Sequence, residues 1–167
     1  MTIDTLKRLL MFAVLCIVQV LVLNQIRLFG YACPLLYLYM VTTFPCTYPK
    51  WGVLLWAFAL GFVIDLFSNT PGVAAASLTA VAAVQPYFLR LFVSNEMIDD
   101  VTPTLHDMGP LKYSFYIVVM AMLYCTFFFL FESFRLFDVM ELIYSVLGST
   151  LLTVVLILAI ENMQKKR

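Results

Sequence analysis

Six long apolar runs divide this chain, and no other feature restricts its fold as strongly. They cover residues 6–23, 31–44, 51–67, 73–92, 113–131 and 142–160. A bilayer core about 30 Å thick is crossed by roughly 20 mostly apolar helical residues. Hydrophobic residues make up 63% of the chain and charged residues 12%, against about 25% charged in a soluble domain. The sequence therefore predicts an all-α integral membrane fold, a single domain of six transmembrane helices over residues 1–167.

The lysines and arginines predict the orientation, because cytoplasmic loops carry the excess of positive charge. If both termini are cytoplasmic, the inner side receives eight of the ten basic residues. These are Lys7, Arg8, Lys50, Arg90, Lys112, Lys165, Lys166 and Arg167, and the outer two are Arg27 and Arg135. An odd number of spans would move the C-terminal basic residues to the other side and remove the asymmetry. Six spans with cytoplasmic N- and C-termini are therefore predicted.

The segments between the runs are mostly too short for a soluble domain. An N-terminal signal peptide is not expected, because Asn24, Gln25 and Arg27 stand where small cleavage-site residues belong. The exceptions in length are an inner acidic segment, 93–112, and an outer segment, 132–141, that mixes charged and apolar residues. The outer segment is expected to lie at the membrane surface or to form a plain turn.

Two prolines bear on the helix boundaries. Pro34, near the start of the second and shortest run, is suited to a first helical turn, where a missing N–H group costs nothing. Pro86 lies inside the fourth run and removes the hydrogen bond to the carbonyl of Ala82, so the sequence predicts a kink or an end there.

Metal-dependent and nucleotide-dependent chemistry has little support. The single histidine, His106, lies in the acidic segment without His-x-x-His or HExxH spacing, which favours a solvated loop over a metal site. Gly61 and Gly72 lie too far apart for a phosphate-binding loop. The four cysteines are Cys16, Cys33, Cys46 and Cys125. Because no two are spaced as Cys-x-x-Cys, we predict that they are small buried hydrophobes.

Nucleophilic catalysis and ion transport are also disfavoured. No serine within a span has a histidine nearby to activate it, so the hydroxyls are expected to bond to the helix backbone or to a neighbouring helix. No ionisable residue occupies the centre of a run, where a transporter usually holds one. We therefore expect no enzyme activity, no cofactor, no metal and no nucleic-acid partner.

The stretch GFVIDLFSNTPGVAAASL, residues 61–78, places a carboxylate near the outer end of the third run. Ala57, Gly61 and Asp65 recur at i, i+4 and i+8 and so share one helix face. A rise of 1.5 Å per residue puts Asp65 roughly 21 Å from Trp51, toward the outer side. Small residues on such a face allow another helix to approach closely.

A tight turn follows this carboxylate. Thr70 is predicted to be the N-cap of the fourth helix and Pro71 a residue of its first turn. The unpaired N–H groups of that helix would then lie near Asp65. We expect the carboxylate of Asp65 to stabilise the hairpin at this turn. The alternative is that Asp65 contacts a partner protein directly.

The fourth run carries two rows of small side chains at helical spacing. One row is Gly72, Ala76 and Ala80, and the other is Ala75, Thr79 and Ala83. A helix with two such faces is predicted to pack in the middle of the bundle or against a single span of a partner.

Residues 61–92 resemble the central signature of the rod shape-determining protein MreD family. The likeness consists of a glycine, an aspartate one turn later, a short polar turn, a second glycine, and a small-residue helix that ends in aromatic and basic residues. Gly61, Asp65 and Gly72 fall on the signature positions. The length, the six predicted spans and the inner termini are similar to the family as well.

The resemblance implies a non-catalytic scaffold subunit of the cell-wall elongation complex in the bacterial cytoplasmic membrane, with a role in rod shape determination. The implied partners are MreC, a single-span protein with a large external domain, and through the complex MreB, RodA and a penicillin-binding transpeptidase. The residues expected to form the structural hairpin or the partner-binding surface are Gly61, Asp65, Pro71, Gly72, Ala76 and Ala80.

The family is also similar in fold to the substrate-binding components of energy-coupling-factor vitamin transporters. A small-molecule-binding subunit of such a transporter is therefore the alternative function. It predicts a ligand cavity that opens to the outside.

Overall fold

The computed structural model describes residues 3–22, 33–45, 48–70, 72–92, 103, 108–132 and 139–165. Within these residues all regular structure is α-helical. The helices are α1 (Ile3–Leu21), α2 (Leu38–Thr42), α3 (Lys50–Ser68), α4 (Val73–Phe92), α6 (Pro110–Glu132) and α7 (Val139–Lys165). The predicted all-α class is confirmed. Residue Pro71, the segment at 133–138, and most of the acidic segment, including His106, lie outside the described residues.

Four of these helices are long and apolar enough to cross a membrane: α3, α4, α6 and the Leu142–Met163 part of α7. They correspond to the predicted runs 51–67, 73–92, 113–131 and 142–160. Many large apolar side chains on their outer faces are exposed, including Leu55, Phe58, Val118, Leu147 and Val155. Such faces suit a hydrocarbon environment, and the chain has the character of a multi-pass membrane protein.

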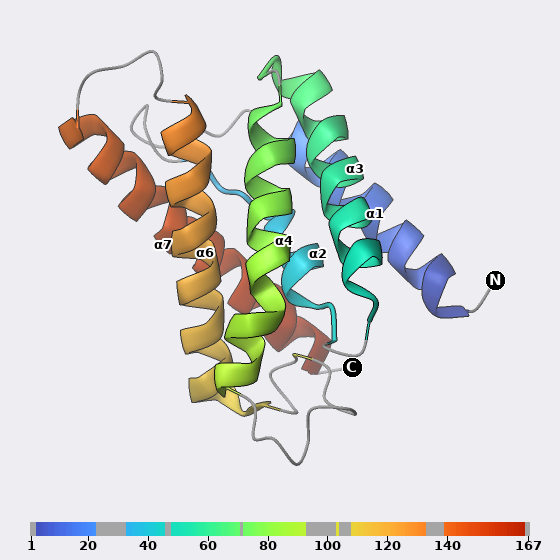
Figure 1. Cartoon of the computed structure of the whole chain (residues 1–167). Coiled ribbons are helices and arrows are strands. Elements are labelled where there is room, and N and C mark those ends of the chain that lie inside the picture. Colours follow the sequence, from blue (N-terminus) through green and yellow to red (C-terminus); the bar gives the residue numbers. More distant parts are fainter. Residues whose placement is uncertain are drawn as a thin grey trace.

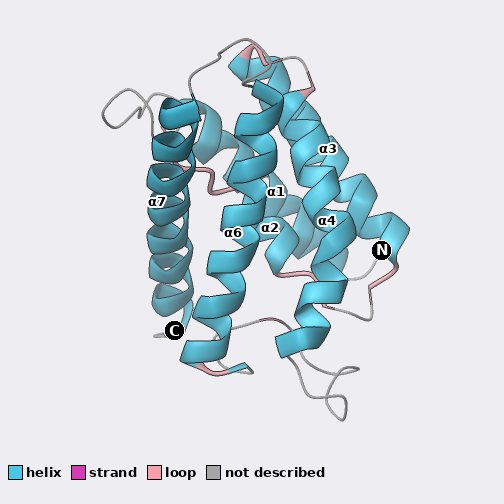
Figure 2. Ribbon diagram, turned by 60° about the vertical axis from the view of Figure 1, so that its left-hand side comes forward, coloured by secondary structure: helices cyan, strands magenta, loops and turns pink. Residues whose placement is uncertain are grey.

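The helices enclose α2. In Figure 1, α3 and α6 run upward, whereas α4 and α7 run downward. α3 and α4 form a hairpin, α6 packs between α4 and α7, and α1 lies obliquely along α3 (Figures 1 and 2). α2 contacts α1, α3, α4 and α6, and all five of its residues are buried.

The second predicted run, 31–44, differs from expectation. It is helical only over Leu38–Thr42, and five helical residues rise about 7.5 Å, far less than the bilayer core. Pro34 lies before this helix rather than in its first turn. The prediction of a transmembrane helix over residues 31–44 is therefore wrong. This run combines a non-helical segment, Cys33–Leu35, with a short helix, and of these residues all but the half-buried Cys33 are buried inside the bundle.

Side chains from α1 bond to the backbone of that segment. Gln19, which is 2% exposed, donates from Nε2 to the carbonyl of Pro34 at 3.0 Å. Its Oε1 accepts the N–H of Leu36 at 3.1 Å. Irregular backbone at membrane depth is tolerated where protein groups satisfy it. Gln19 meets that requirement on one side of the segment.

Side chains from α7 bond to the same segment from the other side. Ser149 Oγ accepts the N–H of Cys33 at 3.0 Å, and Thr153 Oγ1 accepts the N–H of Leu35 at 3.0 Å. Thr153 also donates its hydroxyl to the carbonyl four residues earlier, as expected, and so do Ser77, Thr79, Ser114 and Thr126.

Helix α4 continues through Pro86 to Phe92, so of the two predicted effects of this proline, a kink or an end of the helix, the end is wrong. Four residues before Pro86, the carbonyl of Ala82 loses its helical N–H partner. The rest of the helix is stabilised by packing, since Gln85 and Leu89 on either side of the proline are buried.

Candidate functional site

The α3–α4 hairpin brings together two of the residues singled out in the sequence. Ala57, Gly61 and Asp65 are all buried on the α3 face that meets α4. A Cβ atom at Gly61 would lie 2.5 Å from Cα of Ala75 and 2.7 Å from its backbone nitrogen. Since real Cβ contacts are never that short, the two backbones meet at a distance that only glycine permits.

Asp65 caps the start of α4 from the end of α3. Its Oδ1 accepts the N–H of Ala74 at 2.9 Å, and its Oδ2 accepts the N–H of Ala75 at 2.8 Å. The hydroxyl of Thr70 donates to Oδ1 at 2.9 Å. The first N–H groups of a helix lack helical partners and carry the positive end of its dipole, so a carboxylate is well placed there.

The turn between the two helices uses left-handed backbone. Asn69 ends α3 with a φ of 55°, and Gly72 has a φ of 81°. The N–H groups of Asn69 and Thr70 both bond to the carbonyl of Asp65. These two bonds satisfy the end of α3 in the manner of a C-cap in the left-handed conformation.

The prediction that Thr70 is the N-cap of α4 is therefore wrong, although the expectation that Asp65 lies near the first N–H groups of this helix is confirmed. α4 begins at Val73, three residues after Thr70, and the hydroxyl of Thr70 bonds to Asp65 instead of to the helix. The capping oxygens belong to Asp65, a residue of the preceding helix. Pro71, expected in the first turn, is outside the described residues.

The candidate residues fall into two groups. Gly61 and Asp65 are buried and make their contacts within the hairpin. Gly72 and Ala76 are exposed, and Ala80 is half-buried, on the outward side of α4. We call Gly72, Ala76, Ala80 and the exposed Ala83 the small-residue face. The opposite side of α4 packs inside the fold through Ala74, Ala75, Leu78 and Ala82.

Glu161 of α7 is a second buried carboxylate, which was not predicted from the sequence. It is 5% exposed, and its Oε2 accepts the hydroxyl of Tyr39 at 2.7 Å. The predicted sixth run ended at Ile160, so Glu161 was placed beyond the span, whereas α7 continues to Lys165. The hydroxyl oxygen of Tyr113 is also buried and has no hydrogen-bond partner within the described residues.

A regular spacing could have revealed this group. Ser149, Thr153, Ile157 and Glu161 recur every four residues, and all four are buried. Residues four apart lie on the same helix face. We call Ser149, Thr153 and Glu161 the α7 polar row. Its members contact Cys33, Leu35 and Tyr39 in that order.

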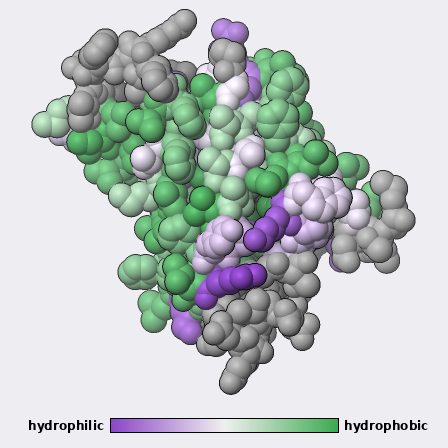
Figure 3. All heavy atoms as spheres, in the orientation of Figure 1, coloured by the Kyte–Doolittle hydropathy of each residue, from purple (hydrophilic) through white to green (hydrophobic). Residues whose placement is uncertain are grey.

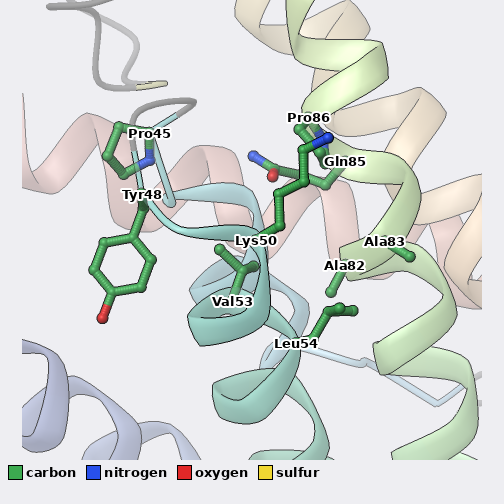
Figure 4. Close-up of a pocket in the computed structure, with 9 residues that line it drawn as sticks. All are labelled: Pro45, Tyr48, Lys50, Val53, Leu54, Ala82, Ala83, Gln85 and Pro86. Atoms are coloured by element: carbon green, nitrogen blue, oxygen red, sulfur yellow. The ribbon is translucent and has the colours of Figure 1, made fainter.

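A pocket of about 190 Å³ lies between the start of α3 and the end of α4. It is lined by Pro45, Tyr48, Lys50, Val53, Leu54, Ala82, Ala83, Gln85 and Pro86 (Figure 4). Gln85 is 2% exposed, and its Nε2 donates to the carbonyl of Phe44 at 2.9 Å and to the hydroxyl of Tyr116 at 3.2 Å.

Among the described residues, no group of three or more histidine, cysteine, aspartate or glutamate side chains is placed to hold a metal ion. In comparisons with protein-family models, with curated proteins and with solved structures, the chain matches none of them.

Proposed function

We propose that this chain is a non-catalytic membrane scaffold subunit of the bacterial cell-wall elongation complex. It binds the single span of MreC and, through the complex, helps to position MreB, RodA and a penicillin-binding transpeptidase. Residence in the bacterial cytoplasmic membrane, six crossings and cytoplasmic termini belong to the same proposal. The resemblance of residues 61–92 to the MreD family is the basis for naming these partners.

The observation that carries the proposal is the small-residue face of α4. Ala76 and Ala83 are exposed on α4, and Gly72 is exposed directly before it, whereas the other side of this helix packs against α3. In lipid, helices associate through close van der Waals packing, which small side chains permit. A rigid hairpin that presents such a face outward suits the docking of one further transmembrane helix.

The order of contacts along α7 supports six crossings. The segment from Cys33 to Tyr39 meets Ser149, Thr153 and Glu161 in sequence order, so it runs in the same direction as α7. Ser149 and Glu161 lie about 18 Å apart along the helix axis. A second passage parallel to the sixth is what a six-crossing chain with both termini on one side requires.

Co-purification tests the scaffold role. The full chain, tagged and co-expressed with MreC of the same organism, is expected to retain MreC in detergent. Ala76→Phe puts a bulky ring on the small-residue face and is expected to abolish retention without unfolding the protein, since Ala76 is exposed. Val155→Phe, on an exposed position of α7, is the matched control and should retain MreC. Failure of the wild type to retain MreC would remove the proposal.

The vitamin-transporter alternative gains no specific support. It predicts a cavity that opens to the outside, near the Asp65 turn. The pocket described above lies at the other end of α3 and α4, beside Lys50, which the charge distribution assigns to the cytoplasmic side.

A further inference from the structure

The pocket beside Lys50 has a mainly apolar wall. Its apolar lining comes from Pro45, Val53, Leu54, Ala82, Ala83 and Pro86. The α4 side consists of Ala82, Ala83, Pro86 and the buried Gln85, and the small side chains of the two alanines leave space between the helices. Pockets that bind small molecules are mostly apolar with a few placed polar groups. The wall alone suits a hydrocarbon chain.

The rim of the pocket is positively charged. Lys50 extends from the start of α3 toward Gln85 and Pro86 (Figure 4), and its Nζ lies 5.1 Å from the ring centre of Tyr87. Arg90 is exposed one turn beyond Pro86, on the same side of α4. Within the described part of the chain, neither cation pairs with a carboxylate. Figure 3 shows hydrophilic side chains gathered over this end of the otherwise largely apolar face.

Two further features add to the positive potential. The guanidinium of Arg8 lies 4.5 Å from the ring centre of Phe44 and 4.9 Å from that of Tyr48, which lines the pocket. α3 begins after Pro49 with no side-chain cap and no acidic residue in its first turn. The exposed N–H groups of a helix start favour an anion.

We propose that this pocket binds an anionic phospholipid of the bilayer. Lys50 and Arg90 hold the phosphate, and one acyl chain lies against Val53, Leu54 and Ala83. Basic pockets between transmembrane helices on the cytoplasmic side are suited to anionic lipid headgroups. A small soluble anion would leave the apolar wall without a ligand, whereas a phospholipid contacts the positively charged rim with its phosphate and the apolar wall with its acyl chain. The inference depends on residence in a membrane and not on MreC binding.

Native mass spectrometry of the full chain, released from nanodiscs with equal amounts of phosphatidylglycerol and phosphatidylcholine, tests the proposal. The wild type is expected to retain phosphatidylglycerol preferentially. Each of Lys50→Gln and Arg90→Gln should lower that preference about fivefold. Lys112→Gln removes a charge outside the pocket and should leave it unchanged. Equal retention of the two lipids by the wild type, or an equal loss in all three variants, would overturn the proposal.

A second pair of variants tests the apolar wall. Ala83→Phe fills the pocket from an exposed position and is expected to reduce retention of both lipids, whereas Ala76→Phe, outside the pocket on the same helix, should not. An excess of inorganic phosphate is expected to leave lipid retention unchanged. Displacement of the lipid by phosphate would contradict a phospholipid site and indicate a site for a small anion.

Discussion

Oδ2 of Asp65 accepts a hydrogen bond from the backbone N–H of Ala75 at 2.8 Å, although the two residues belong to different helices. The same Ala75 backbone lies against Gly61, where no Cβ atom fits. The close approach of α3 and α4 at Gly61 and the capping of α4 by Asp65 therefore depend on each other. Without the glycine the helices would separate, and without the carboxylate the start of α4 would lose its acceptors.

Asp65→Ala is expected to destabilise the protein by about 3 kcal/mol, because hydrogen bonds to a charged group are lost and buried N–H groups are left unpaired. Thermal or denaturant unfolding in detergent measures the loss. Asp65→Asn keeps one acceptor oxygen and should lose less stability than Asp65→Ala. Wild-type unfolding in Asp65→Ala would show that the capping bonds contribute nothing.

Gly61→Ala is expected to destabilise the hairpin by about 1–3 kcal/mol, because the added methyl group overlaps backbone atoms of Ala75 that cannot move independently. Gly52→Ala is the matched control, since its added Cβ comes too close only to the ring of Tyr48, a side chain rather than backbone, and lies at an ordinary contact distance of 3.5 Å from Pro49 Cγ. Both glycines are buried in α3. Equal stability of the two variants would contradict the close approach.

The sequence predicted the hairpin well because its signals are local. The spacing of Ala57, Gly61 and Asp65 identifies a helix face, and a polar turn of a few residues leaves little freedom in how the next helix returns. The cap was assigned to Thr70 because local rules consider only residues next to the helix start. Asp65 reaches that start only because the two helices touch.

The second run could not be predicted in the same way. An apolar run near Pro34 is compatible with a helix or with extended backbone. The choice depends on side-chain acceptors in Gln19, Ser149 and Thr153, two of which are over a hundred residues away. Glu161 was missed for a related reason, since the end of α7 was set by hydropathy, whereas its buried partner Tyr39 holds the carboxylate inside.

Tyr39→Phe is expected to cost about 1.5–3 kcal/mol, because it removes a hydroxyl that donates to a buried carboxylate. A double-mutant cycle with Glu161→Gln should give a coupling energy of at least about 0.5 kcal/mol. Tyr144→Phe, at an exposed tyrosine of the same helix as Glu161, is the control and should be neutral. Additive effects in the cycle would contradict a direct interaction.

Ser149→Ala and Thr153→Val are each expected to cost about 0.6 kcal/mol, the average for hydrogen bonds between membrane helices. Hydrogen exchange gives the more specific readout, because the amides of Cys33 and Leu35 should exchange faster in the corresponding variant. Thr126→Val, whose exposed hydroxyl bonds only within its own helix, should leave both amides unchanged. Unchanged exchange of the Cys33 and Leu35 amides in all three variants would contradict the hydrogen bonds from these amides to Ser149 and Thr153.

The central claim is that the small-residue face of α4 receives the span of MreC. Disulfide crosslinking in native membranes tests it, with the four natural cysteines replaced by serine and single cysteines placed along both spans. Ala76→Cys is expected to give a crosslinked heterodimer with MreC, and Leu151→Cys, exposed on α7, should give none. Crosslinking from Leu151→Cys but not from Ala76→Cys would contradict the claim.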